Sequence, residues 1–304
     1  MKYVFIVNPA AGHGDHEAEI RNALSNLPEK EDCEVYVTTG VGDAMEYAKK
    51  RCQALTDGQE LRLIACGGDG TINEVFNGAA NMPGVSVGVY PCGSGNDFVK
   101  CFGGKERFLD VAALVRAEEQ PLDLLKIGQR YCVNICNFGF DTTVAITMNQ
   151  VRNHKLLGGK NAYTTGVVKA LLTAMKTNCT VTVDGETIND GAMLLCTVAN
   201  GQYVGGAFRC APRAKWDDGL MEVCLVKPIS RLRFVKLLKP YTDGKHLDDP
   251  NFQDIIAYRQ AKTVTVDAEA GFAYSLDGEI IHCEHFTIEM VENALRLAVP
   301  KQQA

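Results

Sequence analysis

The sequence predicts an α/β domain with a mostly parallel, three-layer sheet, followed by an antiparallel β-sandwich domain. In roughly the first 120 residues, apolar runs rich in β-branched side chains alternate with helical patterns, which is typical of parallel sheets covered by helices. After Asp123 the strand-like runs follow one another directly, and recurring Asp-Gly pairs favour tight turns between them. The length of 304 residues suits two domains.

Four strands and the helices between them are expected in the first half. The strand-like runs span 2–7, 33–39, 61–68 and 85–93. The helical spacing of apolar residues predicts helices over 16–27, 43–55 and 72–80. Because each strand ends in a Gly-rich or polar turn, we expect these turns to meet at one rim of the sheet, where such folds bind ligands.

The second half has the pattern of an antiparallel β domain, which we expect to be a sandwich. The strand-like segments are 123–139, 180–188, 192–202, 220–226, 262–269, 272–283 and 286–291. The Asp-Gly pairs lie at 184–185, 190–191, 218–219, 243–244 and 277–278. Helical inserts are expected near 160–176 and 230–240, and the domain boundary is expected near 123–127.

Composition excludes several classes of protein. The formal net charge of −6 gives no support to a nucleic-acid partner, because such proteins usually carry a basic face. The 12 cysteines include no Cys-x-x-Cys pair, so zinc-binding and thioredoxin-like sites are not predicted, and reduced thiols in a cytoplasm fit best. No segment approaches about 18 consecutive apolar residues, and the apolar run 3–7 is too short for a signal peptide.

Three Gly-rich loops follow predicted strands. The strongest signal is Gly67-Gly68-Asp69-Gly70-Thr71, which opens a predicted helix. Glycines let backbone N–H groups approach a phosphate, and the helix N-terminus adds a favourable dipole. A plain turn capped by Asp69 is the structural alternative for this loop alone. The loops 8–14 and 91–97 have the same character, and three such loops at one rim favour a polyphosphate site with Mg²⁺ beside Asp69.

The three loops resemble those of the diacylglycerol kinase catalytic-domain family. They read N-P-x-x-G from Asn8, G-G-D-G-T-I-N-E from Gly67 and P-x-G-S-G-N-D-F from Pro91. That family includes bacterial soluble diacylglycerol kinases, YegS-like lipid kinases and sphingosine kinases. The resemblance covers essentially the whole chain and looks most like a bacterial member. It continues through the segments 122–124, 137–141, 200–201, 211–212, 217–219 and 276–279.

The resemblance implies an enzyme with an NAD kinase/diacylglycerol kinase-like fold. Such an enzyme uses ATP and Mg²⁺ to transfer a γ-phosphoryl group to the hydroxyl of a lipid alcohol such as diacylglycerol. Residues 1–125, joined by a tail at about 287–304, would form the ATP-binding catalytic domain. Residues 126–286 would form the β-sandwich domain, which completes the active site and binds lipid. We expect a cytoplasmic protein with peripheral contact to a membrane surface, and a homodimer is a further expectation.

The resemblance also implies a set of nucleotide-binding and catalytic residues. Glu279 is the implied catalytic residue, Asp277 orients or activates it, and Asp69 acts at the same phosphoryl-transfer site. The residues implied to bind ATP are Asn8, Pro9, Gly12, Thr38, Gly67, Gly68, Asp69, Gly70, Thr71, Asn73, Glu74, Gly93, Ser94, Asn96 and Asp97. The chain departs from the family pattern at His13, where many members have Lys, and at Lys100, where bacterial soluble enzymes commonly have Arg.

Two Mg²⁺ sites follow from the same resemblance. Asp69, Asp97 and Asp123 would surround the catalytic ion, partly through water. A structural ion would use Asp218 with the backbone carbonyls of Lys215 and Leu220. Scattered carboxylates suit Mg²⁺, which prefers oxygen ligands and keeps several waters.

Asp-Gly-Glu occurs twice, at 184–186 and 277–279, and the residues alone do not choose between the copies. The first copy lies in a cleanly alternating segment that is typical of an ordinary hairpin. The family resemblance selects the second copy as catalytic.

Two other functions are weighed against a lipid kinase. A kinase of the NAD kinase type shares the G-G-D-G-T loop, but the loop from Pro91 and the late L-D-G-E fit lipid kinases. A non-catalytic ATP-binding regulator would be expected to lack one of the acidic residues, and all are present. The basic amphipathic segment 229–241 could contact an anionic membrane, or it could pack on the β domain with a solvated basic edge.

Overall fold

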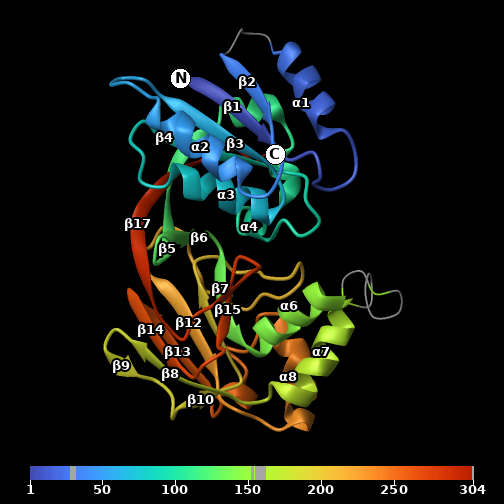
Figure 1. Ribbon diagram of the computed structural model, residues 1–304, viewed down its shortest axis with the longest axis vertical. Helices are drawn as coiled ribbons and strands as arrows, with labels where there is room; N and C mark the ends of the chain where they lie inside the picture. The colour runs from blue at the N-terminus through green and yellow to red at the C-terminus, as the bar shows by residue number, and fades with distance from the viewer. Residues whose placement is uncertain (28–31, 152–153, 155–161, 303–304) are drawn as a thin grey trace. The chain divides into compact units, whose positions relative to one another are not determined.

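The computed structural model describes residues 1–27, 32–151, 154 and 162–302. The chain forms two compact units, and Figure 1 colours them along the chain. Unit 1 comprises Met1–Leu124, Trp216–Gly219 and Val291–Ala304, and unit 2 comprises Leu125–Lys215 and Leu220–Met290. The chain therefore passes from one unit to the other four times.

The centre of unit 1 is a parallel sheet. β1 (Lys2–Val7) lies between β2 (Cys33–Val37) and β3 (Leu61–Gly67), and β3 pairs with β4 (Val85–Pro91). The last part of β17 (His285–Val299) also pairs with β4 in parallel. β3 and β4 are buried at every residue, as expected of strands that are covered on both faces.

The helices of unit 1 pack against each other as well as against the sheet. α2 (Asp43–Gln53) contacts α3 (Asp69–Ala79), and α1 (His16–Ser25) contacts α5 (Val111–Val115). Shorter helical turns follow β4, namely α4 (Asp97–Lys100) and η1 (Lys105–Phe108).

Unit 2 contains two antiparallel sheets with a shared core. One has the strand order β13-β12-β11-β7-β15-β16, and the other joins β10, β8 and β14 to the first part of β17. Phe138 and Val198 of the first sheet belong to one buried cluster with Val181, Val264 and Ile288 of the second. β5 (Glu118–Ile127) begins in unit 1 and ends in unit 2. The other strands of unit 2 are β6 (Arg130–Cys132), β7 (Ile135–Gly139), β8 (Thr177–Val183), β9 (Glu186–Thr187), β10 (Ala192–Met193), β11 (Leu195–Ala199), β12 (Met221–Val226), β13 (Ile256–Ala261), β14 (Thr263–Ala268), β15 (Ala273–Leu276) and β16 (Glu279–His282).

Three helices of unit 2 cover one face of the six-stranded sheet. They are α6 (Phe140–Val151), α7 (Ala162–Thr173) and α8 (Arg231–Thr242), and Figure 1 shows them side by side. Their inner residues Phe140, Ala170 and Phe234 form a buried cluster with Leu195 of β11 and Val226 of β12. A short turn, η3 (Pro250–Phe252), joins the same cluster through its last residue.

The predicted fold class is confirmed by this architecture. Several elements differ from the predicted pattern. The short helices α4, α5, η1 and η3 were not expected, nor were α6 and β13, and β17 continues to Val299 instead of ending at 291. The α6 sequence is rich in Thr, Val and Ile, which favour strands. It is nevertheless helical, because residues spaced four apart, such as Phe140 and Val144, pack together on the sheet.

The segment Trp216–Gly219 lies in unit 1 although strands of unit 2 flank it in sequence. The N–H of Asp123 donates to the carbonyl of Trp216 at 2.7 Å, and the Trp216 ring packs on Phe102 with ring centroids 4.3 Å apart. Trp216 therefore anchors its own loop.

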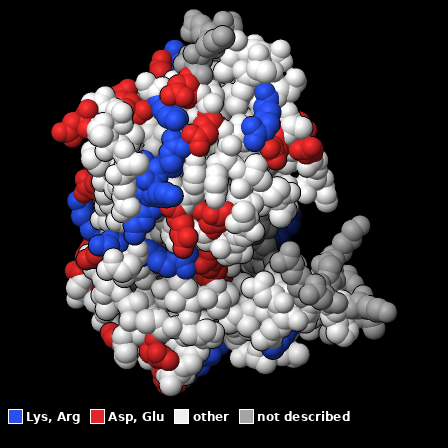
Figure 2. All heavy atoms as spheres, turned by 45° about the horizontal axis from the view of Figure 1, so that its top comes forward, with Lys and Arg blue, Asp and Glu red and all other residues white. Residues whose placement is uncertain are grey.

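Charged side chains of both signs share the molecular surface. On the face drawn in Figure 2, Lys and Arg lie among Asp and Glu. In unit 1, for example, Glu34 pairs with Arg51 at 2.6 Å and with Lys2 at 3.4 Å.

Candidate active site

The three predicted Gly-rich loops of unit 1 lie against one another. A Cβ on Gly12 would lie 1.9 Å from the carbonyl oxygen of Cys92, and a Cβ on Gly93 would lie 2.3 Å from Cα of Gly68. Both distances are far too short for any side chain, and Gly12 also has a φ of +66°. The loops after β1, β3 and β4 therefore approach so closely that only glycine fits at these positions.

Hydrogen bonds fix the three loops in place. The Asn8 side chain donates to Thr71 Oγ1 at 3.1 Å, which joins the first loop to α3. The N–H groups of Cys92 and Gly93 donate to the carbonyl of Gly67 at 3.0 and 3.2 Å. Asn96 closes the third loop, because its side-chain Oδ1 accepts the N–H of Gly93 and its Nδ2 donates to the carbonyl of Gly93.

The N-terminus of α3 faces this loop cluster without a side-chain cap. Its N-cap residue is Gly68, whose backbone is extended and which has no side chain to accept the N–H groups of the first turn. Unsatisfied N–H groups at a helix N-terminus, together with the helix dipole, favour an anion. Thr71 and Asn73 are buried in this helix, whereas Pro9, His13 and Ser94 are exposed.

Asp69 and Asp97 lie close to each other at the third loop. A Cβ on Gly95 would lie 2.9 Å from Asp69 Oδ2 and 3.8 Å from Asp97 Oδ2, so both carboxylates face the space beside this glycine. Asp69 Oδ1 accepts the N–H of Phe98 at 3.3 Å, and Asp97 pairs with Lys100 at 2.5 Å. Lys100 thus contacts Asp97, one member of the acidic pair.

Thr38 and Glu74 occupy positions beside the loops with different local roles. The N–H of Thr38 donates to the carbonyl of Val7 at 2.9 Å, which holds the end of β2 beside that of β1. Glu74 of α3 accepts the N–H groups of Gly42 at 2.9 Å and Ala44 at 3.1 Å. It therefore caps the N-terminus of α2 with a carboxylate.

Asp123 is buried among backbone N–H groups. Its two carboxylate oxygens accept from Gly219 at 2.8 Å and from Asn293 at 2.7 Å. Burial raises the pKa of Asp123, these two N–H groups offset part of that effect, and the neighbouring Glu292 and Asp217 raise it further. Asp123 thus joins three separate segments of unit 1, and its role beside a catalytic Mg²⁺ stays a prediction.

The residues predicted for the structural Mg²⁺ follow one another closely in sequence but are assigned to different units. Asp218 lies in unit 1, and Lys215 and Leu220 lie in unit 2. Within the described part of the chain, no group of three or more His, Cys, Asp or Glu side chains is arranged to hold a metal ion. Both metal assignments therefore stay predictions.

In unit 2, Asp277 sits in a ring of backbone donors. Its carboxylate accepts N–H groups of Val133 at 2.7 Å, Asn134 at 3.0 Å and Ile135 at 2.9 Å. Asp277 has a left-handed φ of +46°, as expected at the turn between β15 and β16. These bonds fix the conformation of the Asp-Gly-Glu turn against the segment before β7.

Glu279 follows that turn at the start of β16 and is partly exposed. Its Oε2 lies 2.6 Å from an Nη atom of Arg130 in β6. This pairing raises the pKa of Arg130. Arg130 was not predicted as a site residue, and no local sequence signal marks it, because its partner lies far along the chain.

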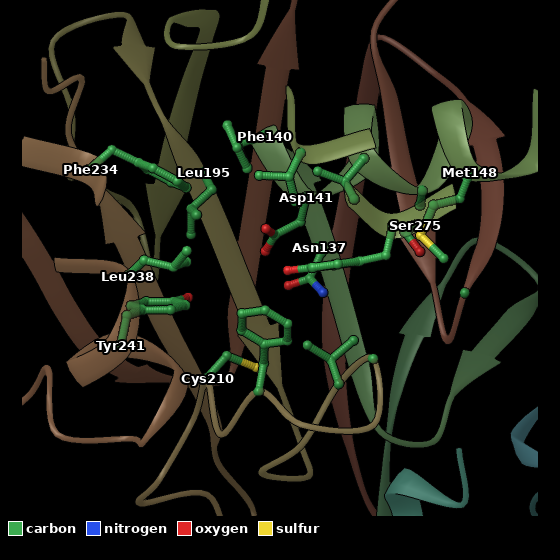
Figure 3. Close-up of a pocket in the computed structure, with 18 of the residues that line it drawn as sticks. Asn137, Phe140, Asp141, Met148, Leu195, Cys210, Phe234, Leu238, Tyr241 and Ser275 are labelled. Carbon is green, nitrogen blue, oxygen red and sulfur yellow. The ribbon is translucent and has the colours of Figure 1, made fainter. Parts of the chain in front are cut away.

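An apolar cavity of about 330 Å³ lies beside the Asp-Gly-Glu turn, within unit 2. Gly278 of the turn lines it together with Ser275, and α6, α7 and α8 supply its apolar wall. Figure 3 shows Phe140, Leu195, Leu238 and Tyr241 around this space, which is of the size that holds small organic ligands.

One side of the cavity is polar. Figure 3 shows the Asp141 carboxylate and the Asn137 amide pointing into the same space. Asn137 Oδ1 accepts from Thr197 at 2.9 Å, whereas no hydrogen bond to the Asp141 carboxylate is formed by the residues that the structure describes. Burial raises the pKa of Asp141 to about 6. No role was predicted for Asp141 from the sequence, although the segment 137–141 that contains it was part of the family resemblance.

Comparison with known proteins identifies the family to which these features belong. Residues 2–127 match the diacylglycerol kinase catalytic domain, and residues 134–299 match the YegS C-terminal NAD kinase beta sandwich-like domain. The chain belongs to the family of diacylglycerol kinases and YegS-like lipid kinases. As a member of this lipid kinase family, it is a phosphotransferase that phosphorylates a lipid.

Individual relatives agree with this placement. A probable lipid kinase YegS-like from Chromohalobacter salexigens is 30% identical over 292 residues, which cover 94% of this chain and 90% of that protein. A diacylglycerol kinase from Bacillus subtilis is 29% identical over 280 residues, which cover 90% and 88%. The crystal structure of a putative diacylglycerol kinase from Bacillus anthracis superposes with a TM-score of 0.76 at 25% identity, covering 98% of this chain and 96% of that one.

In the described residues of this lipid kinase, no helix has both the length and the apolar character needed to cross a membrane.

Proposed function

We propose that this lipid kinase transfers the γ-phosphoryl group of ATP, with Mg²⁺, to the hydroxyl of a lipid alcohol such as diacylglycerol. The observation that carries the proposal is the position of the second Asp-Gly-Glu turn. Its Asp277 is locked by backbone N–H groups, its Gly278 lines an apolar cavity, and its Glu279 is held by Arg130.

The loop cluster of unit 1 suits the polyphosphate of ATP. Gly12, Gly68 and Gly93 let the three loops pack backbone against backbone, Gly70 has open space beside it, and the uncapped N-terminus of α3 favours negative charge. Asn8 and Asn96 hold the loops in this arrangement through their own hydrogen bonds. The phosphates of ATP are therefore proposed to contact mainly backbone groups of the loops and not the exposed His13 side chain.

The carboxylates of Asp69 and Asp97 fit a Mg²⁺ ion. Both face the space that a Cβ of Gly95 would fill, and carboxylate oxygens with water are the ligands that Mg²⁺ prefers. When bound there, the ion would offset the charge of the phosphate oxygens. Lys100 beside Asp97 adds a positive charge at the same place.

Glu279 is proposed to accept the proton of the lipid hydroxyl. As the hydroxyl oxygen bonds to the γ-phosphorus, its proton moves to the Glu279 carboxylate, and the bond from the γ-phosphorus to the β–γ bridging oxygen breaks to release ADP. Arg130 orients the carboxylate through the 2.6 Å ion pair. Asp277 acts through the turn rather than on the substrate, since its oxygens already accept three N–H groups.

The cavity of unit 2 is proposed to take an apolar chain of the lipid. Its wall combines side chains such as Val144, Met148 and Leu238, and its polar side carries Asp141 and Asn137. Because Gly278 lines the cavity, a lipid seated there would have its polar end near the catalytic turn.

The test is transfer of label from γ-labelled ATP to lipid in mixed micelles with Mg²⁺. We expect Glu279→Gln to lower the turnover number by about 10²- to 10⁴-fold, as for loss of a general base. Glu186→Gln is the matched control, because Glu186 occupies the same place in the first Asp-Gly-Glu copy, on the hairpin between β8 and β9. Equal activity of wild type and Glu279→Gln would contradict the assigned role.

The same assay separates this proposal from a kinase of the NAD kinase type. Label in a lipid that depends on Glu279 supports the lipid acceptor. Label that enters NAD, and no lipid, would overturn it.

A further inference from the structure

Exposed apolar side chains concentrate on two neighbouring helices of unit 2. Seven large apolar residues are exposed in the described part of the chain, and five of them lie on α7 and α8. Leu172 is 67% exposed, Leu232 is 69% exposed and Val235 is 60% exposed. Side chains of this size are normally exposed singly, so a group of them indicates an interaction surface.

The two helices are joined where these residues lie. Arg231 at the start of α8 donates to the carbonyls of Leu171 at 2.6 Å and Leu172 at 3.2 Å, near the end of α7. Figure 1 shows α7 and α8 side by side in unit 2. Leu172 and Leu232 are therefore neighbours on one surface, which we call the α7–α8 face and define by Val168, Leu172, Leu232 and Val235.

The charge of this surface differs from that of the chain as a whole. The 24 residues of α7 and α8 contain five basic side chains and no acidic one, in a chain whose net charge is −6. Lys236 and Lys239 are exposed on α8, as are Leu232 and Val235. Two nearby aspartates, Asp243 and Asp254, pair with Lys239 and Arg233 and reduce the positive charge without reversing it.

The inner faces of the same helices line the cavity. Val167 of α7 and Phe234 and Leu238 of α8 point into it, one helix thickness from the exposed residues. An apolar face edged by Lys and Arg is the pattern of a helix that lies in the interface of an anionic bilayer.

We propose that the α7–α8 face docks on the surface of an anionic lipid bilayer. The inference rests on the proposed function, because only an enzyme with a lipid acceptor needs to meet a bilayer. Apolar side chains enter the boundary between head groups and acyl chains, and the surrounding basic side chains face the anionic head groups. Docking thereby brings the cavity-lining helices to the membrane that contains the substrate.

The experiment is co-sedimentation of the full chain with vesicles of phosphatidylglycerol and phosphatidylcholine. We expect the double variant Leu232→Ser/Val235→Ser to bind about tenfold more weakly or worse, since each change removes apolar surface from the interface. Val41→Ser is the matched control, because Val41 is 98% exposed on unit 1, outside this face. Lys236→Glu is expected to weaken binding to the anionic vesicles, and 0.5 M salt is expected to weaken binding of the wild type.

Several outcomes would overturn the inference. One is equal vesicle binding by the wild type and the double variant, with both melting at the same temperature. Another is a dimer in analytical ultracentrifugation that the double variant abolishes without changing vesicle binding, which would make the face a contact between two copies. Phosphoryl transfer to a dissolved short-chain lipid separates the docking proposal from the proposed function. The double variant should keep this activity, because a dissolved lipid requires no docking. If the wild type lacks the activity, the lipid acceptor of the proposed function is refuted instead.

Discussion

Replacement of Asp141 by Asn should stabilise the protein, and more so at high pH than at low pH. Asp141 lies at the polar side of an apolar cavity, and burial raises its pKa from 3.8 to about 6. Its pKa is higher in the folded than in the unfolded state, so folding disfavours the ionised form. The resulting penalty is absent below about pH 4, grows as the pH rises towards 6 and is complete above it.

The size of the effect follows from the shift. A rise of about two pKa units corresponds to about 3 kcal/mol at high pH, and this is an upper value because the carboxylate borders a cavity. About half of that penalty is already present at pH 5, so the gain from Asp141→Asn should be about 1.5 kcal/mol larger at pH 8 than at pH 5. For a unit of this size, that difference corresponds to about 3–6 °C in melting temperature.

The assay is thermal unfolding of wild type and variant at both pH values, without lipid. Asp190→Asn is the matched control, because Asp190 is an exposed aspartate of the same unit, in the turn after β9. A gain that is equal at pH 5 and pH 8, or a variant that is less stable at pH 8, would refute the argument that burial of the charge is responsible.

Three further predictions concern unit 1. Gly93→Ala should weaken ATP binding at least tenfold in calorimetry, because its Cβ would lie 2.3 Å from Cα of Gly68. The control variant Gly40→Ala should bind ATP as tightly as the wild type, because there is open space around Gly40. Arg62→Met should lower the free energy of unfolding by about 3 kcal/mol, because the buried guanidinium donates hydrogen bonds to Glu119 and to the carbonyls of Leu114 and Val115. A loss below about 1 kcal/mol in urea unfolding would contradict this prediction. Asp69→Asn should reduce the turnover number at least about 100-fold and should raise the Mg²⁺ concentration needed for activity, with the melting temperature little changed. Wild-type kinetics in this variant would rule out the assigned metal contact.

The fold class could be predicted because its signals are local and repeated. The strands of unit 1 have apolar, β-branched runs between helical patterns, and the structure pairs them in parallel as expected. The helix α6 was missed because the local preference of its β-branched residues opposes the packing that decides its conformation. The continuation of β17 to Val299 was missed because its end is specified by pairing with β4, which lies far away in sequence.

The candidate site was predictable where function constrains a short run of residues. The glycines of the three loops are needed for backbone approach, and that requirement is visible in the sequence. Arg130 and Asp141 could not be found in this way, because each gains its role from tertiary neighbours: an ion pair with Glu279 and the wall of a cavity. Asp123 was implied by the family resemblance, but its hydrogen bonds to Gly219 and Asn293 could not be predicted, because both partners lie far along the chain.

The two Asp-Gly-Glu turns show why local sequence and local geometry are insufficient here. Asp184 and Asp277 both have a φ of +46°, and both carboxylates accept backbone N–H groups of a neighbouring segment. Only their surroundings differ. Glu186 lies on a hairpin with its side chain 71% exposed and 3.8 Å from Arg259. The Glu279 side chain is 45% exposed, lies 2.6 Å from Arg130 and follows Gly278, which lines an apolar cavity. The same tripeptide thus closes a plain hairpin in one place and, in the other, a turn beside the apolar cavity in which we propose that the lipid binds.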